Sequence, residues 1–166
     1  MKTYNVAPMD LAMRIVTAFV FAFAAAYIIW GIVEPSRRAL LVVGVALLVA
    51  IWIGWEIAPK RYDLTDDALI IVRGWPFRDI SIPTAEIREV RRIKVSPITL
   101  RSFGVGGIFS WSGWFWNKQI GTFFAEITNG HRSVLIDAGR KYVISPEDPD
   151  SFVDEIRPPL SQHPPA

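Results

Sequence analysis

The stretch IVTAFVFAFAAAYIIWGIV, from Ile15 to Val33, decides how this 166-residue chain is organised. Its nineteen residues carry no formal charge, and as an α-helix they would span about 28 Å, which matches the hydrocarbon core of one bilayer. A second uncharged stretch, ALLVVGVALLVAIWIGW, follows from Ala39 to Trp55 and would span about 26 Å as a helix. We expect two transmembrane helices, at about 11–33 and 39–57.

Two other interpretations of these stretches are weaker. A helical hairpin buried in a soluble protein fits poorly, because neither stretch is amphipathic and both are longer than the apolar part of an ordinary surface helix. A cleaved signal peptide has a short apolar core that ends in small residues, whereas the first stretch stays bulky through Tyr27 and Trp30. Only 34–38 separate the stretches, and Pro35 helps to end the first helix. The sequence therefore predicts an antiparallel hairpin with both chain ends on one side.

The basic residues near the hairpin predict its orientation, because Lys and Arg concentrate in cytoplasmic segments. Four of them flank the hairpin on the side of the chain ends: Lys2, Arg14, Lys60 and Arg61. The connecting loop has only Arg37 and Arg38. The absence of cysteine agrees with a reducing compartment. We therefore expect a multi-pass membrane protein with both termini and the following domain in the cytoplasm.

Small residues recur every fourth position in both apolar stretches, and small residues let helices approach closely in lipid. These residues are Ala18, Ala22 and Ala26 in the first stretch, and Ala46, Ala50 and Gly54 in the second. We expect the two stripes to face each other within the hairpin, or to face a second copy in a dimer. The alternative is that alanine is simply common in membrane helices.

From Pro59 onward the chain changes to short apolar runs separated by turn residues, a pattern typical of β-strands. The expected strands are Ala68–Arg73, Ile80–Pro83, Thr122–Thr128, Ser133–Asp137 and Lys141–Ile144. The pairs Asn129-Gly130 and Ala138-Gly139 have the residue types of hairpin connections. The pattern predicts an antiparallel meander or a partly closed barrel.

A short helix is predicted near the end of the chain. Asp148 can cap it, Pro149 can occupy its first position, and Phe152, Val153 and Ile156 then share one face. Prolines after Arg157 stop the helix. The expected organisation is a hairpin segment at 1–58, a β domain at 59–157 and a disordered tail at 158–166.

Three motifs in the β domain resemble the bacterial pleckstrin-homology-like (PH-like) domains that follow membrane helices. They are FGVGGIF at Phe103–Phe109, GWFWNK at Gly113–Lys118 and GRKYVISP at Gly139–Pro146. The resemblance covers most of 62–156 and implies an α+β fold, in which a PH-like antiparallel barrel or sandwich is closed by a C-terminal helix. It implies no chemistry, because such domains are chiefly binding platforms. Together with the expected anchor and orientation, the resemblance implies a location in the bacterial inner (cytoplasmic) membrane.

One connection departs from the PH domains that bind phosphoinositides. Those domains use a basic loop between their first two strands, whereas the corresponding residues here are Thr65-Asp66-Asp67. Two carboxylates would repel a phosphorylated head group. A phosphoinositide site at this position is therefore not expected.

The stretch Phe103–Gly121 holds six aromatic residues and five glycines, and it is the first candidate binding region. Interpreted as a loop, it offers the apolar faces and N–H donors of Trp111, Trp114 and Trp116. One interpretation is that Phe109, Phe115 and some of the tryptophans fill the core. The other is that Trp111 and Trp114 are exposed and contact a membrane surface or a partner protein.

The second candidate region is a cluster of positive charge. Five basic residues lie within fourteen positions: Arg88, Arg91, Arg92, Lys94 and Arg101. Near an anionic leaflet each would gain about 1 kcal/mol. The alternative is a solvated strand edge protected from aggregation by its charge. Nucleic acid is not an expected partner, because the net charge is only +2 and no binding motif accompanies the cluster.

Catalysis is not expected. The chain has no cysteine, and its two histidines, His131 and His163, fall in a predicted turn and in the proline-rich tail. No catalytic, metal-binding or cofactor-binding residue is predicted, and a hydrolase or transferase is the least favoured class.

The expected function is a membrane-anchored binding or scaffolding module. We expect it to recruit a protein partner and to contact inner-leaflet lipid, and a homo-oligomer is a further expectation. The alternative is an auxiliary subunit of a larger membrane complex, bound through the helical hairpin.

Overall fold

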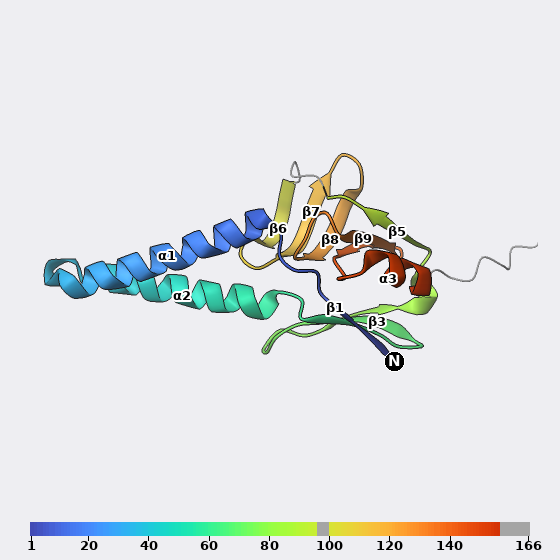
Figure 1. The fold of residues 1–166 in the computed structure, drawn as a ribbon, viewed down its shortest axis with the longest axis horizontal. Coiled ribbons are helices and arrows are strands. Elements are labelled where there is room, and N and C mark those ends of the chain that lie inside the picture. The colour runs from blue at the N-terminus through green and yellow to red at the C-terminus, as the bar shows by residue number, and fades with distance from the viewer. Residues whose placement is uncertain (96–99, 157–166) are drawn as a thin grey trace, which may run out of the picture.

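The computed structural model describes residues 1–95 and 100–156, so the expected tail at 158–166 lies outside the described residues. A helical hairpin projects from one end of a domain that contains two β-sheets and one C-terminal helix (Figure 1). The fold class is α+β, as predicted. The two sheets do not close into a barrel, which leaves the sandwich alternative.

The hairpin consists of α1 (Leu11–Val33), a 3₁₀ turn (Pro35–Arg37) and α2 (Ala39–Ile57). Asp10 caps α1, since its Oδ1 accepts a hydrogen bond from the Met13 N–H at 2.9 Å. Both helices are long and apolar enough to cross a membrane, and only 17% of the most apolar window of each is buried. Neither is therefore a core helix of this domain, because a core helix would be mostly buried.

The seam between the helices does not follow the predicted small-residue stripes. Within the hairpin the stripes do not face each other, because Ala18, Ala22, Ala26, Ala46 and Ala50 are exposed and only Gly54 is buried. The alternative, that the stripes face a second copy, stays a prediction. The buried positions are Met13, Thr17, Ala24 and Gly31 on α1, with Gly44, Ile51 and Gly54 on α2.

The geometry of the helix explains this difference. Every fourth position rotates by about 40° around a helix, so a four-residue stripe soon leaves a seam between two long neighbouring helices. A seven-residue spacing, as at Thr17, Ala24 and Gly31, drifts by only about 20°. Small residues still mark the closest approach, because a Cβ on Gly44 would lie 2.5 Å from Cγ1 of Ile28.

The first sheet has four antiparallel strands in chain order: β1 (Lys2–Asn5), β2 (Arg61–Leu64), β3 (Ala68–Val72) and β4 (Ile80–Pro83). Its first strand precedes the hairpin, within the 1–58 segment, where no element was predicted before about residue 11. Tyr4 of β1 lies opposite Tyr62 of β2. The helical hairpin is therefore an insertion between two neighbouring strands of one sheet.

The second sheet has six strands in the order β5-β9-β10-β8-β7-β6. They are β5 (Glu89–Ile93), β6 (Leu100–Gly106), β7 (Trp111–Asn117), β8 (Gly121–Ile127), β9 (Ser133–Asp137) and β10 (Lys141–Ile144). The expected hairpin at Asn129-Gly130 is wrong, because β10 lies between β8 and β9 and pairs with β8 in parallel. The sheet is therefore mixed. The chain leaves β8, forms β9 two positions away in the sheet, and then returns to form β10 between the two.

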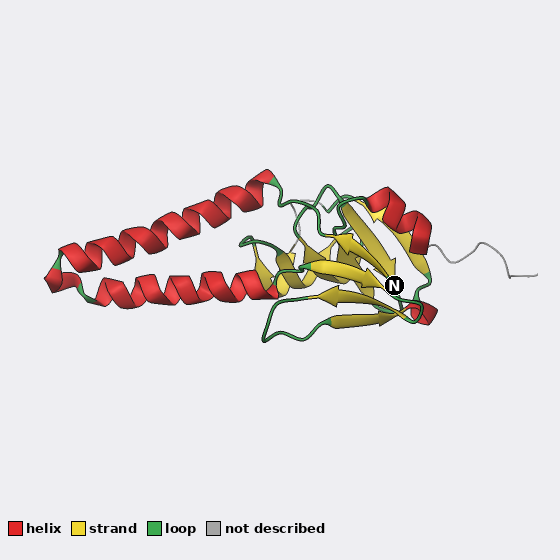
Figure 2. Ribbon diagram, turned by 60° about the horizontal axis from the view of Figure 1, so that its bottom comes forward, coloured by secondary structure: helices red, strands yellow, loops and turns green. Residues whose placement is uncertain are grey.

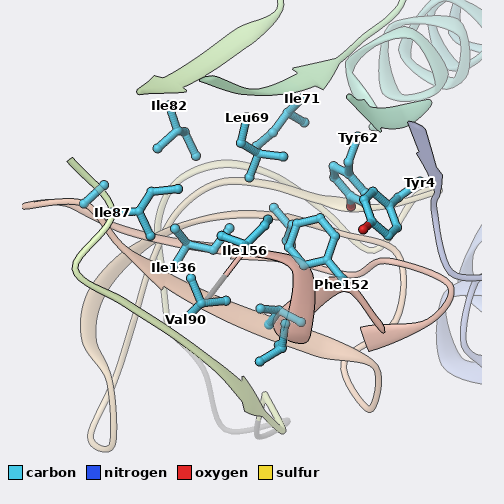
Figure 3. Close-up of a cluster of buried hydrophobic side chains, with 14 residues drawn as sticks. Tyr4, Tyr62, Leu69, Ile71, Ile82, Ile87, Val90, Ile136, Phe152 and Ile156 are labelled. Carbon is cyan, nitrogen blue, oxygen red and sulfur yellow. The ribbon is translucent and has the colours of Figure 1, made fainter. Parts of the chain in front are cut away.

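The core lies between the sheets and is closed by α3 (Pro149–Ile156) (Figure 3). Asp148 caps this helix, as predicted, by accepting hydrogen bonds from the N–H groups of Asp150 and Ser151. The hydroxyl of Tyr62 joins the two sheets, since it donates to the Glu126 carbonyl at 2.9 Å and accepts from the Ser145 N–H at 3.1 Å. Both sheets and α3 therefore act as one folded unit.

Truncation of Tyr4 should show that β1 belongs to this core. The Tyr4 ring is buried and makes an edge contact with Phe152 at 4.9 Å between centroids. Tyr4→Ala is expected to cost about 3 kcal/mol and to lower the unfolding temperature by roughly 10 °C. Tyr4→Phe is the matched control, because the Tyr4 hydroxyl has no hydrogen-bond partner within residues 1–95 and 100–156, and it should leave stability unchanged. Equal midpoints for wild type and Tyr4→Ala in detergent would place β1 outside the core.

The helix seam makes a separate prediction. Gly44→Leu should destabilise the hairpin by about 1–3 kcal/mol through overpacking against Ile28. Ala22→Leu, on the exposed side of α1, should change monomer stability by less than about 0.5 kcal/mol. Thermal unfolding and light scattering of the detergent-solubilised chain measure stability and oligomeric state together. A larger loss for Ala22→Leu than for Gly44→Leu would contradict this seam.

Candidate functional site

The predicted aromatic loop is in fact a β-hairpin that separates its three tryptophans. Successive side chains of a strand point to opposite faces, so Trp111 lies on one face of β7 while Trp114 and Trp116 lie on the other. Trp111 is half-buried and stacks on Phe115 with ring centroids 5.6 Å apart. Trp114 is half-buried against Phe124, and Trp116 is exposed. The three residues therefore do not form one surface.

The connection between β6 and β7 packs against the two helices, which diverge toward the domain (Figure 2). The backbone N–H of Phe109 donates to Oγ1 of Thr17 on α1 at 3.2 Å. The Phe109 ring makes an edge contact with Trp55 of α2, with centroids 5.1 Å apart. Phe109 is buried, in agreement with the core interpretation, but in the contact with the hairpin and not between the sheets. This connection ties β6 and β7 to both helices.

The basic cluster is also divided by the fold. Arg88 and Lys94 are exposed at the two ends of β5, while Arg91 pairs with Glu89 at 2.8 Å and Arg92 pairs with Asp150 at 2.7 Å. Arg101 lies on β6, at the opposite edge of the sheet, and its side chain lies outside the described part of the chain. In Figure 1, β5 lies farther from the helical hairpin than β6 does. The basic residues of β5 therefore do not share a surface with Trp114.

A cleft of about 620 Å³ lies where the sheets meet the helical hairpin, and we call it the hairpin-side cleft. Its apolar lining comes from α2, the β3–β4 connection and the second sheet: Ile57, Phe77, Phe103, Trp114 and Phe124. Its polar lining comes from Arg73, Ser102, Ser112 and Glu126. Of the three predicted tryptophans, only Trp114 lines this cleft.

The β3–β4 connection holds one side of the cleft against the end of α2. The N–H of Gly74 donates to the Glu56 carbonyl at 2.8 Å, and Ile57, the last residue of α2, lines the cleft itself. Trp75 of this connection is 81% exposed, and Phe103 on the opposite side is 79% exposed. Two exposed aromatic rings therefore accompany the cleft at the end of the hairpin.

The polar centre of the cleft is the carboxyl group of Glu126. The residue is only 1% exposed, and its Oε2 accepts a hydrogen bond from Oγ of Ser112 at 2.9 Å. Among the described residues, no group forms a hydrogen bond to Oε1, and Nη1 of Arg73 lies 3.6 Å from it, within ion-pair range but too far for a hydrogen bond. Burial raises the pKa of Glu126 to about 8, although Ser112 and Arg73 act in the opposite direction. At neutral pH the carboxyl is therefore mostly protonated.

The guanidinium of Arg73 is fixed from its other side. Its Nε donates to the Arg78 carbonyl at 2.8 Å, and Nη2 donates to the same oxygen. These bonds direct Nη1 toward Glu126. The cleft therefore presents one cationic donor and one unsatisfied carboxyl oxygen close together.

Two glycines line the cleft where β6 and β7 approach most closely. Gly104 and Gly113 lie opposite each other with φ values of 138° and 132°. A Cβ on Gly104 would lie 2.3 Å from the Ser112 carbonyl oxygen, and one on Gly113 would lie 2.4 Å from that of Phe103. Only glycine fits either position, which accounts for one glycine in each of the first two resemblance motifs.

Arg73 and Glu126 were not among the residues predicted for the site. A signal for Glu126 exists in TFFAEIT, where one carboxylate interrupts an otherwise apolar strand. Arg73 ends an apolar strand and has no comparable signal. Within the two described ranges, no three His, Cys, Asp or Glu side chains are grouped to hold a metal ion.

Comparison with known proteins matches residues 60–159 to a family model described as a bacterial PH domain. The match covers more than half of the chain and begins at β2, after the hairpin. No curated protein and no solved structure matches significantly.

Glu126→Gln should remove a pH dependence of stability. Glu126 has a pKa of about 8 in the folded chain, against 4.5 ordinarily. Between these values the folded chain keeps a proton that the unfolded chain releases, so the contribution of Glu126 to stability is fully present below about pH 4.5 and is lost as the pH rises toward 8. Thermal unfolding from pH 5 to 8.5 should show a steeper fall for wild type than for Glu126→Gln. Glu89→Gln, at an exposed carboxylate, should keep the wild-type slope, and equal slopes for all three proteins would contradict the assignment.

Proposed function

Since the chain belongs to the bacterial PH domain family, we propose that it is a membrane-anchored, non-catalytic binding module. The observation that carries this proposal is the hairpin-side cleft, which combines apolar walls with an unsatisfied buried carboxyl oxygen next to the end of α2. A concave apolar site with a few convergent polar groups is the usual form of a ligand site. The module would hold a ligand in this cleft and recruit a protein partner with its outer surface.

Anchoring by the hairpin is supported by what lies at its two ends. Trp30, near the loop end of α1, is covered by Arg37 at 4.9 Å from the ring centroid. Trp55, near the domain end of α2, is covered by Lys60 at 3.8 Å. Tryptophans beside basic residues are typical of the two membrane–water interfaces. Between these ends most large apolar side chains of both helices are exposed, as lipid contact requires.

The proposed location is the cytoplasmic face of the bacterial inner membrane. The hairpin leaves the first sheet after β1 and returns to it at β2, so the domain lies at one end of the hairpin. Basic residues gather at that end, which favours a cytoplasmic domain. The side of β5, with Arg88, Arg91 and Lys94, then points away from the bilayer and is the surface that we propose for a protein partner.

A second candidate function is an auxiliary subunit that binds a larger membrane complex through the hairpin. The exposure of Ala18, Ala22 and Ala26 favours it, because a stripe of small residues allows another helix to approach closely. In this case the domain surface would be secondary.

Cross-linking in intact membranes should separate the two candidates. For the binding module, Arg91→Glu with Lys94→Glu should reduce the cross-linked partner about tenfold, the effect of losing roughly 1.4 kcal/mol of binding free energy. Ala18→Leu with Ala22→Leu is the matched hairpin variant and should leave the yield unchanged. Mass spectrometry identifies and quantifies the cross-linked protein.

Two outcomes would overturn the proposal. Loss of the partner only in the hairpin variant would favour the auxiliary subunit. Release of the full chain into the supernatant by an alkaline carbonate wash would remove the anchor from both candidates.

A further inference from the structure

We propose that the hairpin-side cleft binds the head group of a phospholipid that carries both a phosphate and a primary amine, taken from the leaflet beside it. The proposal rests on the proposed function, because the hairpin must hold the cleft at the bilayer. In the complex the phosphate contacts Arg73, the ammonium contacts Glu126, and the acyl chains stay in the membrane.

The position of the cleft supports a lipid as the source of the ligand. Ile57 ends a helix that is apolar enough to cross the membrane, so the cleft that it lines lies at the depth of the lipid head groups. Phe103 lines the cleft, Trp75 lies in the β3–β4 connection that contributes to its lining, and both residues are exposed. Exposed aromatic rings are stable at the interface between hydrocarbon and water. A head group therefore reaches the cleft without leaving the bilayer.

The polar groups of the cleft match the two charges of the head group. Nη1 of Arg73 lies 3.6 Å from Oε1 of Glu126. This oxygen is buried and has no hydrogen bond to any described residue. A phosphate accepts well-directed hydrogen bonds from a guanidinium, and a primary ammonium donates to Oε1 of Glu126 and favours the ionised form of this carboxyl, which is mostly protonated without a ligand. A zwitterionic head group supplies both partners, whereas a head group with a phosphate but no amine offers Oε1 of Glu126 no cationic donor.

The walls of the cleft favour the same ligand. Trp114 and Phe124 lie beside Glu126 on one face of the second sheet, with ring centroids 5.2 Å apart. An ammonium near aromatic faces gains attraction from the ring electrons. The volume of about 620 Å³ falls within the usual range of small-molecule sites, so a head group fits without the acyl chains.

Native mass spectrometry of the full chain in detergent micelles tests the proposal. Phosphatidylethanolamine and phosphatidylglycerol with identical acyl chains are added in equal amounts, and the fraction of protein carrying each lipid is measured. Wild type should retain the amine lipid about tenfold more, which corresponds to one additional charge-assisted hydrogen bond. Glu126→Gln should bring this ratio close to one, and Arg73→Gln should weaken both lipids.

Trp116→Ala is the matched control, because Trp116 lies on the same strand face as Trp114 but does not line the cleft. It should keep the wild-type ratio. Soluble phosphoethanolamine is added as a competitor and should not displace the lipid at equal concentration. Displacement at equal concentration would show that the ligand is a free phosphate ester and would overturn the lipid assignment.

Equal retention of both lipids by wild type, or a preference that survives in Glu126→Gln, would overturn the proposed contacts. Thermal unfolding of each variant shows whether the fold is intact. Failure of this inference leaves the cross-linking result unchanged, whereas release of the chain by carbonate would remove the proposed function itself.

Discussion

The pairing of β1 with β2 is the constraint on which the rest of the structure depends. These strands are neighbours in one sheet although the whole helical hairpin separates them in the chain, so both ends of the hairpin are fixed to that sheet. The β6–β7 connection adds a third attachment through Phe109, which contacts α1 and α2. Three attachments restrain rotation of the domain about the helices, and they hold the hairpin-side cleft beside the end of α2.

The cleft lies where the end of α2 and the β3–β4 connection face the second sheet. Away from the hairpin, Tyr62 and the side chains of α3 fill the space between the sheets. Near the hairpin, Gly104 and Gly113 have no side chains to fill the cleft. Among the described residues, Oε1 of Glu126 has no hydrogen-bond partner. An unsatisfied buried carboxyl oxygen is destabilising by itself. A ligand that donates a hydrogen bond to this oxygen removes the destabilisation, and this gain contributes to its binding free energy.

The sequence predicted those helices and strands whose own residues form a recognisable pattern. The apolar length of α1 and α2, the short apolar runs of β3 and β8, and the Asp148 cap of α3 are all local. The sequence did not reveal β1, because four residues before an apolar stretch have no distinct period and their partner lies beyond the hairpin. The place of β10 between β8 and β9 is equally non-local. The helix seam was misassigned because a four-residue stripe is conspicuous in a sequence, whereas helix packing depends on rotation about the axis.

The candidate site was harder to predict than the fold, for a related reason. Trp111 and Trp114 are close in sequence, but strand alternation places them on opposite faces of β7. Residues that are close in sequence therefore do not form one group of side chains here. The converse holds for Arg73 and Glu126, which are distant in sequence and meet only because the β3–β4 connection docks on α2 opposite β8. The β3–β4 connection, α2 and β8 must all be packed together before Arg73 and Glu126 face the same cleft. The chemistry of the site is therefore a property of the assembled sheets, and the single carboxylate in TFFAEIT is the part of it that a strand pattern exposes.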